Sequence, residues 1–172
     1  MPKDFRLIDV KQRCIVQPTK LERYCVLSYV WGSAGQFLLK ESNFEQLTTS
    51  NGIDTITNLP QTILDAIELC VKVGCPYLWV DSLCIIQDSP SDKHSQIRAM
   101  DAIYSQSYLG IFAAAGDGAN AGLSPFGRHG RQPAIESLLV NVKPSLRLAA
   151  TLSPQIAAEG IARSTWASRA WT

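Results

Sequence analysis

Runs of apolar residues divide the chain into a β-rich beginning and an alternating middle. The first thirty residues hold three runs of β-branched and aromatic residues, "FRLIDV", "RCIVQ" and "YCVLSYV", which are typical of strands. A short polar break separates the first two runs, so we expect an N-terminal β-hairpin. The third run ends at Trp31 and Gly32, and Ser33, Ala34 and Gly35 follow. These small residues permit a tight turn or a close approach of the backbone to a ligand.

A helix is predicted between Asn58 and Gly74, because Asn58 can cap its start and Gly74 can end it. At about 100° per residue, its apolar side chains cover one broad face. Asp65, Glu68 and Lys72 are left on a narrow polar stripe. We therefore expect this helix to pack against a sheet. The apolar face comprises Ile63, Leu64, Ala66, Ile67, Cys70, Val71 and Val73.

The run "YLWV", from Tyr77 to Val80, follows this helix and is typical of a strand covered on both faces, with Trp79 in the core. Strand, helix and strand in this order predict a parallel, right-handed crossover. A second helix over roughly 91–107 and a buried strand in "LGIFAAA" continue the alternation. "SLLVNV" and "LRLAAT" indicate two more strands. The pattern predicts an α/β fold with a mostly parallel central sheet flanked by helices, an added N-terminal β-hairpin and extra C-terminal strands.

Composition and charge exclude several classes of protein. The chain has 172 residues, which suits one domain, and its 16 Lys plus Arg against 15 Asp plus Glu give a net charge of +1. Such a balance does not favour nucleic-acid binding. No apolar run reaches the roughly twenty residues of a membrane span, and the beginning "MPKDFRLIDV" does not resemble a signal peptide. We therefore expect a cytoplasmic protein without a membrane span.

Cysteine and histidine usage bears on disulfides and metals. The five cysteines include no C-x-x-C pair, and the chain has two histidines. This argues against a disulfide framework, a structural zinc site and any other metal centre. The chain ends in "STWASRAWT", an apolar segment that carries an arginine. We expect residues 1–172 to form a single domain that is a fragment of a longer protein.

Polar side chains follow two of the predicted strands, at the carboxyl ends where open parallel sheets bind ligands. Trp31, Gly32 and Ser33 follow one strand, while Asp81 and Cys84 follow "YLWV". If these strands are neighbours, an indole, a carboxylate and a thiol share one rim. Asp81 is the candidate catalytic residue. The candidate ligand-binding residues are Trp31, Gly32, Ser33, Cys84, Gln87, Gln96, Arg169 and Trp171.

A structural explanation stays open for most of these candidates. Asp81 can instead cap a turn, and Cys84, between two apolar residues and far in sequence from any histidine, is more typical of a small buried hydrophobe. Trp31 either stacks on a ligand or covers the edge of the core. Gln96 is more typical of a helix-surface amide. Arg169 either binds an anion or pairs with a buried carboxylate such as that of Asp81.

The long loop "GDGANAGLSPFGRHGRQP" is a candidate lid or a surface excursion. Its first part, "GDGANAG", superficially resembles a calcium or phosphate loop. It has one acid where a calcium loop needs several, and it lacks the Lys-Ser/Thr of a P-loop. We therefore assign it no ligand.

Four blocks, in order along the chain, resemble the fungal heterokaryon incompatibility (HET) domain. They are "YCVLSYVWG", "LPQTILDAIELCVKVGCPYLWVDSLCIIQD", "QIRAMDAIYSQSYLGIFAAAG" and the closing "SRAWT". Two positions depart from the family pattern. Where many relatives carry "DW..E", this chain has Lys93 and Gln96, and it stops at Thr172 where the family continues into Gln-Glu.

The resemblance implies an effector domain that triggers regulated cell death in fungal non-self recognition, when genetically different hyphae fuse. Self-association, induced by an upstream sensor domain or protein, is the expected mechanism. HET domains are also proposed relatives of Toll/interleukin-1 receptor (TIR) domains, which implies a TIR-like, flavodoxin-like sheet. The alternative function is therefore a TIR-like NAD glycohydrolase, with NAD as substrate and no further cofactor. Asp81 would then stabilise an oxocarbenium-like transition state while Trp31 holds the nicotinamide.

Overall fold

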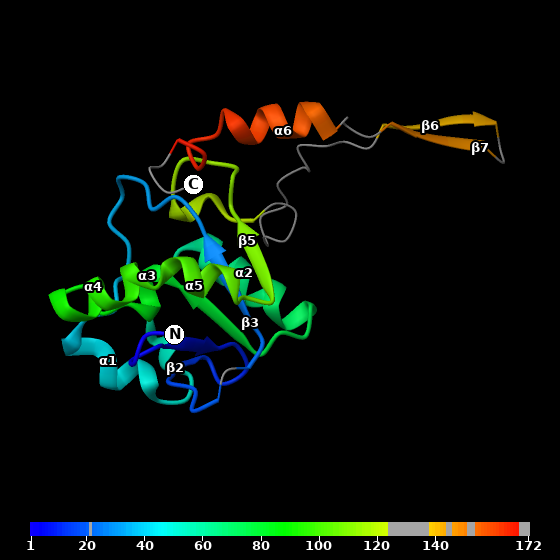
Figure 1. Ribbon diagram of the computed structural model, residues 1–172. Coiled ribbons are helices and arrows are strands. Elements are labelled where there is room, and N and C mark those ends of the chain that lie inside the picture. Colours follow the sequence, from blue (N-terminus) through cyan, green and yellow to red (C-terminus); the bar gives the residue numbers. More distant parts are fainter. Residues whose placement is uncertain (21, 124–137, 144–145, 151–153, 169–172) are drawn as a thin grey trace.

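The computed structural model describes residues 1–20, 22–123, 138–143, 146–150 and 154–168 (Figure 1). Within these residues, the main sheet has the strand order β2-β1-β4-β3-β5. Its strands are β1 (Leu7–Asp9), β2 (Cys14–Val16), β3 (Tyr24–Ser28), β4 (Tyr77–Val80) and β5 (Leu109–Phe112). The neighbours β4, β3 and β5 are parallel, whereas the hairpin β1–β2 joins β4 in antiparallel orientation. The predicted α/β fold and hairpin are confirmed, but the sheet is mixed because the hairpin extends it.

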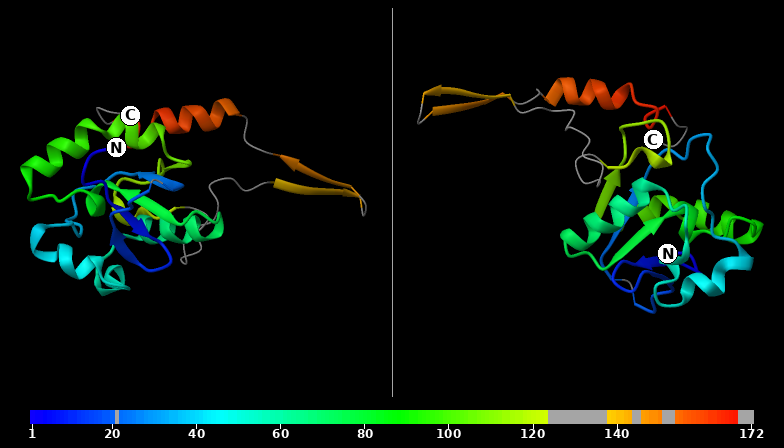
Figure 2. Two further views of the ribbon diagram at one scale, coloured as in Figure 1. Left: turned by 60° about the horizontal axis from the view of Figure 1, so that its bottom comes forward. Right: turned by 180° about the vertical axis from the view of Figure 1, so that it is seen from behind.

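Helices cover both faces of this sheet. Figures 1 and 2 show α2 on one face and α4 and α5 on the other. The helix predicted over 91–107 is divided at Ala99, whose backbone (φ −98°, ψ 4°) is not helical. The helical elements are α1 (Glu41–Thr48), η1 (Gly52–Thr55), α2 (Gln61–Lys72), α3 (Asp81–Cys84), α4 (Pro90–Arg98), α5 (Met100–Ser105), η2 (Ala119–Ala121) and α6 (Pro154–Ala162).

Helix α2 confirms the predicted helix but not the whole of its predicted polarity. Asp65, expected on a polar stripe, is 2% exposed, because the loop after β5 packs over it: the N–H of Leu123 donates to Asp65 Oδ2 at 2.7 Å. Val71 and Val73, expected on the apolar face, are exposed. Asn58 precedes the capping position, which Pro60 occupies.

The core lies on both sides of the central strands β3 and β4. Trp79 is fully buried, as predicted, and meets Tyr104 of α5 edge-to-face with ring centroids 5.9 Å apart. β5 differs from the prediction of a buried strand, because Leu109 and Phe112 are exposed. It is the last strand on its side of the described sheet, so no described strand pairs with its outer edge.

The two predicted C-terminal strands are present as β6 (Leu138–Lys143) and β7 (Leu146–Ala150). They pair with each other in an antiparallel, two-stranded sheet that extends away from the main body (Figures 1 and 2). Among the described helices, none is both long and apolar enough to cross a bilayer.

Candidate functional site

The strand order places a candidate site at the carboxyl ends of β3 and β5. β3 lies between β4 and β5 and is parallel to both, so the chain moves outward from β3 in opposite directions. In open α/β sheets, ligands bind in the crevice outside such a point. We therefore expect the segments that follow β3 and β5 to form a ligand-binding site.

Trp31, after β3, and Asp81, after β4, are in direct contact. The indole N–H of Trp31 lies 3.2 Å from Oδ1 and 3.1 Å from Oδ2 of Asp81. The backbone N–H of Ser82 also donates to Oδ1, at 2.7 Å. The predicted proximity of these two side chains is thus observed, and the carboxylate fixes the orientation of the indole. Their roles toward a ligand stay predictions.

A cavity of about 390 Å³ opens beside Trp31. This volume is at the low end of the roughly 300–1,000 Å³ typical of small-molecule sites. Trp31, Gly32 and Ser33 are among the residues that line it. Asp81 is not among the described lining residues and reaches the cavity only through its hydrogen bonds with Trp31. The described lining residues are Trp31, Gly32, Ser33, Ala34, Gly35, Gln36, Asn58, Pro60, Asp117, Gly118, Ala119, Asn120 and Ala121.

The opposite wall of this cavity is the "GDGANAG" loop, whose sequence matches no ligand-binding motif. The loop approaches the turn after β3 backbone to backbone. The N–H of Ala119 donates to the carbonyl of Trp31 at 3.3 Å. A Cβ added to Gly32, whose φ is +76°, would lie 2.9 Å from the Cα of Gly118. Sequence reasoning missed Asp117, Gly118 and Asn120, although a glycine-rich loop directly after a strand was the available signal.

The loop is anchored to the beginning of α2. The N–H of Gly122 donates to the hydroxyl of Thr62 at 3.0 Å, and the side-chain oxygen of Asn120 accepts from the N–H of Gln61 at 3.4 Å. The carboxylate of Asp65 accepts from the N–H of Leu123, the residue after Gly122. These contacts fix the cavity wall relative to the helix that follows Asn58 and Pro60.

Tyr29, the residue after β3, bonds two side chains next to the site. Its hydroxyl donates to Gln36 Oε1 at 2.9 Å and lies 2.8 Å from the hydroxyl of Ser82. Burial, followed by the negative charge of Asp81, raises the pKa of Tyr29, so the hydroxyl stays protonated. The side-chain nitrogen of Gln36 is buried and has no hydrogen-bond partner among the described residues. A buried, unpaired amide at the cavity is a donor available to a ligand.

Cys84 is fully buried at the end of α3. Its sulfur accepts from the N–H of Val80 at 3.4 Å, and burial raises the pKa of the Cys84 thiol to about 12. Such a thiol is protonated at neutral pH and is a poor nucleophile. The structure therefore agrees with the packing explanation for Cys84, which is not among the described cavity residues.

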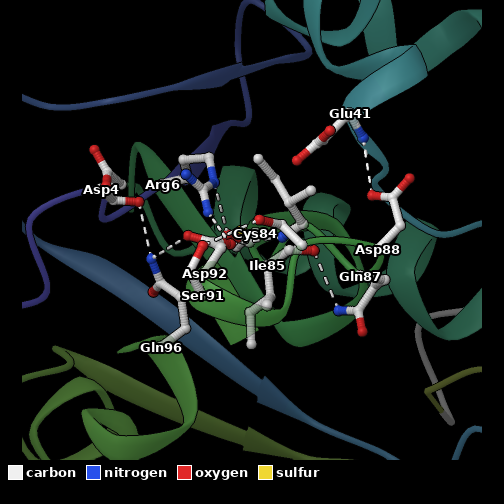
Figure 3. A network of polar contacts seen from close by, with 12 residues as sticks. Asp4, Arg6, Glu41, Cys84, Ile85, Gln87, Asp88, Ser91, Asp92 and Gln96 are labelled. Atoms are coloured by element: carbon white, nitrogen blue, oxygen red, sulfur yellow. Dashed lines mark hydrogen bonds and ion pairs between the residues drawn. The ribbon is translucent and has the colours of Figure 1, made fainter. Parts of the chain in front are cut away.

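Gln87 and Gln96 hold backbone segments together. The Gln87 amide donates to the carbonyls of Asp81 and Ile85, at 2.9 and 3.1 Å. Gln96 is fully buried, against the expectation of a surface amide, because its amide donates to the carbonyl of Asp4 at 2.9 Å (Figure 3). Neither side chain is among the described residues that line the cavity. The candidates Arg169 and Trp171 lie outside the described residues.

Comparison with protein families decides the relationship suggested by the sequence blocks. The family model described as "Heterokaryon incompatibility protein (HET)" matches residues 24–172. The chain belongs to the HET family. Membership implies a role in heterokaryon incompatibility and cell death. The match contains the whole cavity and begins after the β1–β2 hairpin. Neither the comparison with curated proteins nor the comparison with solved structures gave a match.

The segment that follows α6, over 163–168, lies at the same edge of the sheet. The indole N–H of Trp166 donates to the hydroxyl of Ser28, at the end of β3, at 2.8 Å, and its ring meets Phe112 of β5 edge-to-face. The hydroxyl of Thr165 donates to Oδ1 of Asp117. The segment after α6 therefore supports the cavity wall. Among the described residues, no group of three or more His, Cys, Asp and Glu side chains is placed to hold a metal ion.

Proposed function

We propose that this HET domain contributes to cell death by binding and hydrolysing a nicotinamide nucleotide such as NAD. The observation that supports this proposal is the cavity where the strand order reverses, beside an indole that a carboxylate holds in place. Aromatic rings, amides and a carboxylate are the groups that recognise a ring, a ribose and a developing positive charge.

The reaction breaks the bond between the nicotinamide nitrogen and C1′ of the ribose. The bonding electron pair leaves with the nitrogen and neutralises the positive ring, so that nicotinamide departs as a neutral base. Water adds to C1′, releases one proton and leaves ADP-ribose. No general acid is needed for the leaving group. Trp31 holds the nicotinamide. Asp81 is not among the described residues that line the cavity; it fixes the Trp31 indole, and through that ring its negative charge favours the oxocarbenium-like transition state.

Removing the charge of Asp81 is expected to lower the rate of nicotinamide release from NAD about 10- to 100-fold. In Asp81→Asn the amide oxygen can still accept from the Trp31 indole N–H. The substitution therefore removes the negative charge and keeps the hydrogen bond that orients the indole. Asp88→Asn is the matched control, since Asp88 is exposed and its carboxylate bonds the N–H of Glu41 at 3.0 Å. The assay follows released nicotinamide for this chain and for one that extends past Thr172. Absence of NAD turnover by both forms at high concentration would refute the proposed hydrolysis. An unchanged rate of nicotinamide release in Asp81→Asn would refute the proposed role of Asp81.

Induced self-association is a second candidate mechanism, which the outer edge of β5 favours. β5 is outermost in the described sheet, and Tyr108, Leu109 and Phe112 are 58%, 38% and 54% exposed. An unpaired strand edge is a template for pairing with another chain. Exposed apolar side chains beside it add area to bury. An upstream sensor domain or protein would supply the trigger by bringing copies together.

Leu109→Lys is expected to weaken self-association about tenfold or more, because a charge on an edge strand opposes pairing. Sedimentation equilibrium over a range of concentrations measures this constant. Val71→Lys is the control, since Val71 is 58% exposed on α2, away from the edge. A form that kills cells but stays monomeric at high concentration would argue against assembly.

A further inference from the structure

We infer that the cavity beside Trp31 selects a planar, positively charged ring, an N-substituted pyridinium, and that Asp117 provides the opposing charge. The inference deepens the proposed function, since the nicotinamide of NAD is such a ring. Its evidence is the charge and shape of the cavity itself.

The charge of the cavity wall is negative. Among the described residues that line the cavity, Asp117 is the one acidic residue, and none is Lys, Arg or His. The beginning of α2, next to Pro60, carries a partial positive charge of about half a unit. That charge is smaller than the full unit of a carboxylate, and the first N–H of the helix already bonds Asn120. The wall therefore favours a cation over an anion.

Trp31 provides a surface for a planar cation. Indole is the most effective aromatic side chain for holding a positive charge over its face. The N–H of Trp31 donates to both oxygens of Asp81, which fixes the ring and makes its π system more negative. Asp81 is thus a positioning residue for this site, because it acts on a ligand through the indole.

Asp117 and Gln36 supply the remaining selectivity. The hydroxyl of Thr165 donates to Oδ1 of Asp117, which holds the carboxylate at the cavity wall. The buried, unpaired nitrogen of Gln36 suits the carboxamide oxygen of a nicotinamide. The volume of about 390 Å³ favours one ring with its ribose over an entire dinucleotide.

A series of three similar ligands with different charges tests this inference by calorimetry on the full chain. The ligands are 1-methylnicotinamide (a cation), nicotinamide (neutral) and nicotinate (an anion). The cation is expected to bind about fivefold more tightly than nicotinamide, nicotinate least tightly, and added salt should narrow the differences. Asp117→Asn should abolish the preference while still accepting from Thr165. Asp101→Asn, a change of an exposed acid on α5, should preserve it.

Three outcomes would overturn the inference. They are binding of none of the three ligands, equal binding of nicotinate and the cation, and a cation preference that persists in Asp117→Asn. Circular dichroism establishes that the variant is folded, and Trp31→Leu, which should lose cation binding, gives a second test. Cation preference without NAD turnover would contradict only the proposed enzyme. Turnover without cation preference would contradict only the inference.

Discussion

Asp92→Ala is expected to lower the free energy of unfolding by about 3–5 kcal/mol, because it leaves a buried charge without its partner. The partner is Arg6, whose side chain is 2% exposed and forms an ion pair with Asp92, itself 10% exposed (Figure 3). A guanidinium cannot lose its proton to escape this cost. It can regain solvent only if the segment before β1 leaves the body of the protein.

The contacts around this pair explain the size of the expected effect. The Arg6 guanidinium also donates to the carbonyl of Cys84 at 3.0 Å, and Asp92 Oδ2 accepts from the N–H of Ile86 at 2.8 Å. Loss of the carboxylate therefore also deprives a backbone N–H of its acceptor. With the bond from Gln96 to Asp4, these contacts fasten the chain before β1 to α4.

Chemical denaturation followed by circular dichroism measures this prediction. Asp101→Ala is the matched control, since Asp101 is exposed on the next helix, and its cost should stay within about 0.5 kcal/mol. The double variant Arg6→Met/Asp92→Leu should recover part of the loss, because it removes both charges but still leaves the Ile86 N–H and the Cys84 carbonyl without these partners. A cost below about 1 kcal/mol for Asp92→Ala, or an equal cost in the double variant, would contradict the argument that an unpaired buried charge is responsible.

Sequence reasoning predicted the contact between Trp31 and Asp81 because it needed only the direction of two strands. Residues after parallel neighbours meet at one edge of a sheet, and β3 and β4 are parallel neighbours. The burial of Arg6 could not be predicted in this way. It sits between apolar residues at the start of the chain, and its partner Asp92 is on a distant helix.

The wall of the cavity could not be predicted for a related reason. The "GDGANAG" loop fits none of the motifs in which side chains or backbone groups bind ions. Its position depends on β5 pairing directly with β3 and on contacts with α2. The same contacts bury Asp65, which helical spacing alone placed on a polar stripe. Local patterns do not contain the strand order that produces these contacts.

Gly32→Ala is expected to lower the free energy of unfolding by about 2–4 kcal/mol and to distort the cavity. The backbone of Gly32 has φ +76°, a left-handed conformation that costs an L-residue about 1–2 kcal/mol. The added Cβ would also lie 2.9 Å from the Cα of Gly118 and 3.1 Å from the carbonyl oxygen of Asp117. Both are backbone atoms, so the two loops must separate to accommodate the methyl group.

Gly118→Ala is the matched control on the other side of the same contact. A Cβ there would lie 3.7 Å from the Cα of Gly32, an ordinary contact, and φ is −169°, which any residue adopts. Its cost should stay below about 1 kcal/mol. Denaturation measures the stability of both variants, and 1-methylnicotinamide measures the cavity. Separation of the loops moves Asp117 away from Trp31, so Gly32→Ala should lose stability and cation binding together. Equal stability and binding in the two variants would show that the loops do not meet as tightly as these distances require, and the cavity would lose its wall.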